Sequence, residues 1–182
     1  MSYSINPEPE DSGSAGIDPA KLEQLMREKH AEQSLPLAII AGLAASLIAA
    51  GLWAAITYTT NYQIGFMAIG VGFLVGYAVK YFGKGFNVSF GIVGAAFALF
   101  GCLAGNLLTS ILSLSQLEES SVSIVLFAFL ASPGIIVEVM KETFSPIDLL
   151  FYAIAIYEGY KLSFNSPTEE ELANIQIKPN TV

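Results

Sequence analysis

Hydrophobic residues gather in long stretches in the middle of this chain, and polar residues dominate both ends. Residues 35–79 contain no Asp, Glu, Lys, Arg or His, and only the segment TYTTNYQ at 57–63 interrupts their apolar character. About 20 consecutive apolar residues cross a hydrocarbon core roughly 30 Å thick, so this pattern predicts two helical spans, at 35–58 and 64–81. A further apolar stretch predicts a third span at 90–114.

The next apolar segment, at 121–143, is broken in its middle by Ser132-Pro133. After the break the apolar and charged side chains separate onto opposite sides, and the charged side carries Glu138, Lys141 and Glu142. This pattern is typical of a re-entrant or interfacial segment and less typical of a complete crossing.

The last helix has a readable start at Ser145-Pro146, an N-cap followed by a proline at the first helical position, and Asp148 stands where a capping-box acid belongs. Residues 146–164 are just long enough to cross. We therefore predict an all-α integral membrane protein, a compact bundle of four transmembrane helices plus the Pro-broken segment. Five transmembrane helices are the alternative.

Both ends of the chain are polar and acidic. Residues 1–17 have neither a basic nor an apolar region of the kind that signal peptides require, and we interpret them as a disordered acidic tail. Asp18-Pro19 then caps a predicted amphipathic helix within 18–34, with Leu22 and Leu25 on its apolar side. Residues 165–182 form a second acidic tail.

Composition and charge agree with a membrane protein. The chain is 53% hydrophobic and 13% charged, against about 25% charged residues in soluble domains. Its net charge of −8 argues against a nucleic-acid partner. Lys21, Arg27 and Lys29 precede the first span, while Lys80 and Lys84 follow the second, so the positive-inside rule predicts a cytoplasmic N-terminus.

Small residues recur every few positions along each of the first three spans. Such stripes let helix backbones approach closely, which replaces the missing hydrophobic drive in lipid. We expect them to pack spans within one subunit, with a homo-oligomer interface as the alternative. The predicted packing or oligomer-interface residues are Gly42, Ser46, Ala50, Ala68, Gly72, Gly76, Gly101 and Gly105.

The third span also carries the most polar stripe inside the predicted membrane region. Asn106 is its sharpest feature, because an amide in hydrocarbon needs a hydrogen-bond partner. The structural interpretation is hydrogen bonding between helices, and the functional one is a polar path or ligand pocket. The candidate path comprises Cys102, Asn106, Thr109 and Ser113, together with Glu158 of the last helix.

Glu158 has its own structural interpretation. It precedes Lys161 by three residues, which predicts an ion pair at the membrane interface. A proton relay or a cation site at Glu158 is the functional alternative.

The sequence offers little support for an enzyme. Its one histidine, His30, lies outside the predicted spans and has no Cys or His companion, which argues against haem or a His-based zinc site. No G-x-S-x-G motif is present. We expect no catalytic residues, no metal and no cofactor, and we identify no small-molecule substrate.

Two segments resemble a known group of proteins. NYQIGFMAIGVGFLVGYAVKYFGKG at 61–85 and FSPIDLLFYAIAIYEGYKLSF at 144–164 are similar to a family of uncharacterised small multi-pass bacterial membrane proteins with a glycine-rich second span and an aromatic C-terminal helix. The resemblance covers about the last four-fifths of the chain. It implies a location in the bacterial inner (cytoplasmic) membrane and supplies no activity or catalytic residue.

These observations favour a non-enzymatic membrane component, either a self-associating scaffold or an accessory subunit of a larger assembly. Its expected partners are the lipid bilayer and either further copies of the chain or other membrane subunits. The alternative is a small channel or transporter that uses the polar face of the third span.

Overall fold

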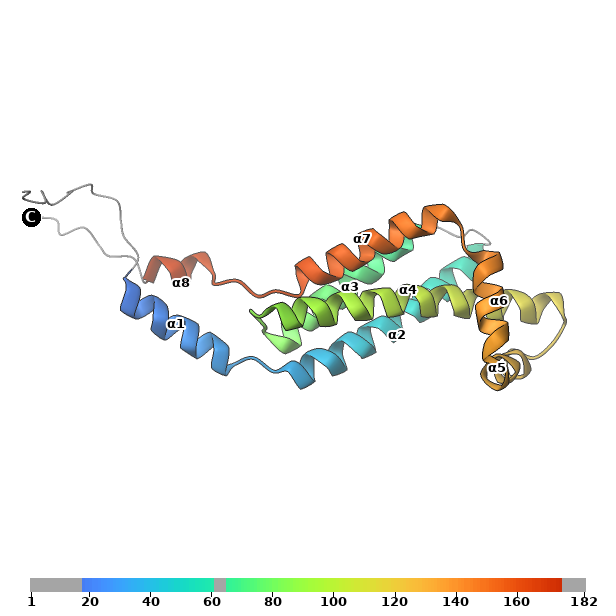
Figure 1. The fold of residues 1–182 in the computed structure, drawn as a ribbon, viewed down its shortest axis with the longest axis horizontal. Helices are drawn as coiled ribbons and strands as arrows, with labels where there is room; N and C mark the ends of the chain where they lie inside the picture. Colours follow the sequence, from blue (N-terminus) through green and yellow to red (C-terminus); the bar gives the residue numbers. More distant parts are fainter. Residues whose placement is uncertain (1–17, 61–64, 175–182) are drawn as a thin grey trace, which may run out of the picture. The chain divides into compact units, whose positions relative to one another are not determined.

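The computed structural model describes residues 18–60 and 65–174, and within them the protein is an all-α membrane bundle (Figure 1). Among the described residues, those within 29–165 form one compact unit, while 18–28 and 166–174 belong to another. The predicted tail at 1–17, the loop at 61–64 and the last part of the C-terminal tail, 175–182, lie outside the described residues.

Four long helices lie side by side in the larger unit: α2 (Leu35–Thr60), α3 (Phe66–Gly83), α4 (Val88–Leu117) and α7 (Pro146–Leu162) (Figure 1). The first three are long and apolar enough to cross a membrane. α7 has 17 residues, the lower end of the length that spans a bilayer. α4 has 30 residues and is about 45 Å long, so it exceeds the predicted span at both ends.

α2 and α4 run in the same direction. Near their starts, Gly42 lies against the ring of Phe97, and towards their ends Gly105 lies against the ring of Trp53. A methyl group built on Gly42 would stand 2.7 Å from that phenylalanine ring, which is closer than van der Waals contact. Glycine at this position therefore lets α2 and α4 pack closely.

α3 and α7 both run opposite to α2 and α4. Gly83 at the end of α3 lies against Ala38 near the start of α2, and Gly94 near the start of α4 lies against Gly159 near the end of α7. The end of α4 and the start of α7 are therefore at the same end of the bundle. The segment between α4 and α7 must therefore begin and finish at this same end of the bundle.

The broken segment forms two short helices at that end of the bundle, α5 (Val122–Ala131) and α6 (Pro133–Thr143) (Figure 1). Their axes are bent by 111°, as expected where a proline removes a backbone donor. Val125 and Phe129 of α5 pack on Ile111 of α4, which anchors the pair to the bundle. The directions of α4 and α7 thus favour four spans plus a returning segment over five spans.

The turn between α3 and α4 is hydrogen-bonded to the residue before α2 and to a residue just after α7, where the chain enters and leaves the bundle. Lys84 has a left-handed backbone (φ 49°). The N–H of Ser34, before α2, donates to the carbonyl of Gly83 at 2.9 Å, and the N–H of Asn165, after α7, donates to the carbonyl of Gly85 at 2.8 Å. We call residues 83–85 the clasp turn.

Small residues fill the centre of the bundle. Ala38, Ala50, Ala68, Ala98 and Ala155 are fully buried. Because each contributes only a methyl group, the helices approach until their backbones are in contact. Many larger apolar side chains of α2, α3 and α4, such as Ile40, Tyr77 and Ile92, are exposed, as lipid-facing side chains are, whereas Trp53 and Val75 are buried.

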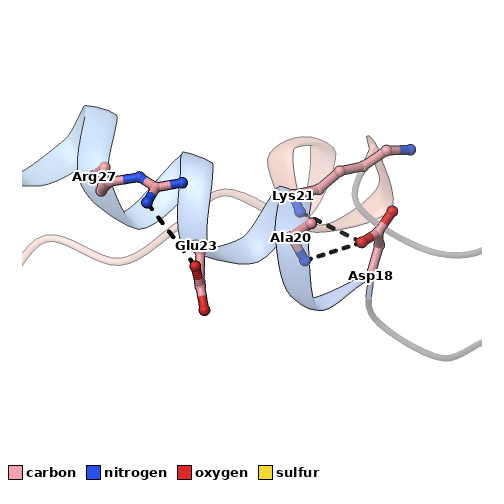
Figure 2. Close-up of polar contacts among 5 residues, drawn as sticks. All are labelled: Asp18, Ala20, Lys21, Glu23 and Arg27. Atoms are coloured by element: carbon pink, nitrogen blue, oxygen red, sulfur yellow. Dashed lines mark hydrogen bonds and ion pairs between the residues drawn. The ribbon is translucent and has the colours of Figure 1, made fainter.

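The smaller unit contains the first part of α1 (Pro19–Ala31) and α8 (Glu169–Asn174). Asp18 caps α1 as its sequence predicts: one carboxylate oxygen accepts from the N–H of Ala20 at 3.0 Å and from that of Lys21 at 3.4 Å (Figure 2). An exposed ion pair joins Glu23 to Arg27 one turn later, at 3.9 Å (Figure 2). The helix ends at Ala31, within the predicted 18–34 segment.

Candidate functional site

The polar stripe of α4 is buried in its middle and opens at its end. Cys102, Asn106 and Thr109 are 0%, 2% and 8% exposed, whereas Ser113 is exposed. The stripe therefore runs from the packed core of the bundle towards α6, which lies across the last turns of α4 (Figure 1).

Asn106 finds its hydrogen-bond partner on α7. Its amide nitrogen donates to the hydroxyl oxygen of Tyr152 at 3.2 Å, and both side chains are buried. This bond joins two antiparallel helices in the interior of the bundle. It supports the structural interpretation of Asn106, hydrogen bonding between helices.

A pocket of about 410 Å³ lies between the end of α4 and α6. Asn106, Thr109 and Ser113 line it from α4, and Glu138 and Glu142 line it from α6. The two carboxylates stand four residues apart, so they follow one side of α6. The pocket thus combines an amide, hydroxyls and two acids at one end of the bundle.

Two hydroxyl groups on this part of α4, those of Thr109 and the neighbouring Ser110, are already bonded to their own helix. Thr109 donates to the carbonyl of Gly105 at 2.9 Å, and Ser110 donates to the carbonyl of Asn106 at 3.0 Å. Bonds of this kind satisfy a hydroxyl in an apolar setting without any ligand. In this structure the strongest polar character of the pocket comes from the two glutamates.

The candidate path does not form one continuous site. Cys102 lies in the packed core and does not line the pocket. Glu158 is on α7, with its backbone carbonyl near Gly76 of α3, and does not line the pocket either. Only Asn106, Thr109 and Ser113 of the predicted path share one pocket.

The predicted ion pair between Glu158 and Lys161 is not among the ion pairs of the described residues. The ammonium group of Lys161 lies over the ring of Tyr157 instead, 5.4 Å from its centroid. An ammonium group above an aromatic face is attracted by the electron-rich ring. Asp148, by contrast, is the predicted cap of α7, since it accepts from the N–H of Ser145 at 2.8 Å.

All the small residues singled out in the sequence face other helices of the same chain. Gly72 lies against Ala155 of α7, and Gly76 against Leu162. Gly101 faces Val71 on α3, while Ser46, Ala50 and Ala68 are fully buried. These positions, with Gly42 and Gly105, are therefore occupied inside the subunit, and an oligomer would need a different surface.

Three important residues of this region were not identified as site residues in the sequence. Tyr152 is 46 positions away from Asn106, and no local pattern connects them. Glu138 and Glu142 stand on the charged side of the broken segment, but their spacing does not say which helix they face. The one sequence signal for this pair is their spacing of four residues, which places both carboxylates on the same side of a helix.

The chain was compared with known protein families, curated proteins and solved structures. No family model, no curated protein and no solved structure matches this chain.

Proposed function

We propose that this multi-pass membrane protein is a non-enzymatic scaffold or accessory subunit of a membrane assembly. The observation that carries the proposal is the closed centre of the bundle, where Ala98, Cys102 and Ala155 are fully buried. Close packing through the middle holds the helices in place, which supports a structural role over a pore along the axis of a single subunit. We also propose the bacterial inner membrane as its location, with a cytoplasmic N-terminus, from the charge pattern and the family resemblance.

The copy number and composition of the particle in its native membrane test this proposal. The protein is extracted with its surrounding lipid by a polymer that forms native nanodiscs, and the particle mass is measured. A scaffold or accessory subunit is expected in a particle with a reproducible stoichiometry of more than one chain. A particle that contains a single chain, at every expression level down to the natural one, contradicts the proposal.

A small transporter or channel is the second candidate, favoured by the pocket between α4 and α6. Glu138 and Glu142 give that pocket a negative charge next to the buried amide of Asn106. Carboxylates at the mouth of a membrane protein attract cations. In this proposal a cation would enter at the pocket. Its path across the membrane would need a second surface beyond the pocket.

Ion and solute flux into proteoliposomes tests the second candidate. Wild type is compared with Glu138→Gln combined with Glu142→Gln, which removes the charge and keeps the shape. Asn106→Leu and Glu158→Gln probe the two other polar positions of the candidate path, and Glu118→Gln, an exposed acid outside the pocket, is the matched control. Flux that is absent in wild type, or unchanged by all three pocket and path variants, removes this candidate.

A further inference from the structure

We infer that the outer seam between α2 and α3 binds one acyl chain of a membrane phospholipid. Two adjoining hollows of about 450 and 270 Å³ lie along this seam, and both include Leu74. The larger one extends from Leu37 to Ile48 on α2, and the smaller one from Ala49 to Ile56. We call the two together the seam groove.

The lining of the seam groove is apolar throughout. Alanines form much of the larger hollow, between the larger side chains of Leu37, Ile40 and Phe82. In the smaller hollow Gly70 contributes no side chain, and nothing stands within 4 Å of the position its Cβ would take. A lining that offers no charged group selects a hydrocarbon chain and gives a headgroup nothing to bind.

The length of the groove matches the membrane. From Leu37 to Ile56 α2 rises about 29 Å at 1.5 Å per residue, close to the roughly 30 Å of a hydrocarbon core. Both helices are among those long and apolar enough to span a membrane. The groove therefore runs along the hydrocarbon layer, where acyl chains are the surrounding solvent.

The width of the groove favours an acyl chain over a helix. Leu37 to Ile48 cover about 17 Å of the helix axis, so a hollow of about 450 Å³ has a mean cross-section of about 27 Å². A helix about 10 Å across needs about 80 Å². Beneath the groove α2 and α3 are already in contact, since a methyl group on Gly42 would stand 3.1 Å from Val79. An unbranched chain fits this space, whereas a helix from a second copy is too wide to enter it and could only pack across its opening.

Trp53 provides a built-in reporter for the occupant. It is the one tryptophan of the chain, it lines the smaller hollow, and it is only 3% exposed. Bromine atoms on a lipid chain quench tryptophan fluorescence at short range. The probe is therefore phosphatidylcholine with brominated acyl chains, in vesicles that contain the full-length wild-type protein.

Two leucine substitutions make a matched pair for this measurement. Gly70→Leu places a side chain in the seam groove, whereas Gly51→Leu adds the same side chain to an open surface of α2 that does not line it. We expect strong quenching of wild type and of Gly51→Leu. In Gly70→Leu quenching should fall by about twofold or more, because a filled volume excludes the chain.

A third variant and a dilution series complete the test. Ala44→Phe fills the larger hollow from an exposed position and should also reduce quenching, so the test does not depend on one substitution. Circular dichroism checks that each variant keeps its helices. Equal quenching of Gly70→Leu and Gly51→Leu, or an unquenched wild type, overturns the inference. Quenching that appears only on dilution of the protein in lipid also overturns it, since a second copy then covers the groove.

Discussion

The amide nitrogen of Asn106 and the hydroxyl oxygen of Tyr152 are hydrogen-bonded at 3.2 Å between two antiparallel helices, in the interior of the bundle. Each is less than a tenth exposed. The bond therefore gives the buried amide of α4 a partner on the last long helix of the chain.

We expect Tyr152→Phe to lower the stability of the bundle by about 1 kcal/mol, because hydrogen bonds between membrane helices contribute about 0.6 and at most about 1.7 kcal/mol. Thermal unfolding in mild detergent measures the effect. Tyr77→Phe is the control, since Tyr77 is 55% exposed. If both substitutions change the midpoint equally, the interhelical bond contributes nothing particular.

The second prediction concerns the stability effect of a substitution at Gly72, where α3 and α7 approach closely. A methyl group there would stand 2.6 Å from the backbone carbonyl oxygen of Ala155, and backbone cannot rotate away as a side chain does. We expect Gly72→Ala to lower stability by about 1–3 kcal/mol, the usual range for overpacking. Gly70→Ala, two residues away and open, is the matched control and should be neutral or slightly stabilising. A stable Gly72→Ala would show that the two helices pack less closely than described.

The clasp turn predicts a substitution that stabilises the protein. Lys84 holds a left-handed backbone, which costs a residue with a side chain about 1–2 kcal/mol. Its ion pair with Glu32, at 3.2 Å, is more than half exposed on both sides and contributes little. Lys84→Gly should therefore unfold at a higher temperature than Lys84→Ala, which lacks the ion pair and keeps the strain. Equal midpoints for the two variants would argue against the left-handed turn.

Helix direction predicts which introduced cysteines share a side of the membrane. Glu32→Cys and Asn165→Cys should react with an impermeant maleimide from one side, and Ser120→Cys from the other. Cys102 is fully buried, so wild type serves as the unlabelled background. Labelling of Asn165→Cys from the same side as Ser120→Cys would favour the five-span arrangement.

The long helices were predictable because their signals are local. An unbroken apolar run, a proline at a helix start and an acid at the third position are all read within a few residues, as at Ser145 and Asp148. The sequence also showed that Asn106 requires a partner. It did not identify Tyr152, because that pairing follows from the antiparallel placement of α4 and α7.

The pocket was harder to predict than the helices. Thr109 and Ser113 were recognised as one stripe because they share a face of α4. Glu138 and Glu142 complete the pocket only because α6 folds across α4 after a 111° bend, and a proline predicts a break without fixing its angle. Glu158 was grouped with the stripe on its charge alone, and α7 carries it elsewhere.

The clasp turn also bears on how the protein is made. The ribosome completes Gly85 long before it reaches Asn165, so the Gly85 carbonyl lacks the Asn165 N–H as its partner while the earlier helices enter the membrane. The same interval leaves the close-packing surfaces at Gly72 and Gly94 facing lipid. Only the arrival of α7 covers these surfaces and satisfies the carbonyl. A chain that ends before α7 would therefore keep a backbone acceptor and a glycine-lined surface that the finished protein covers.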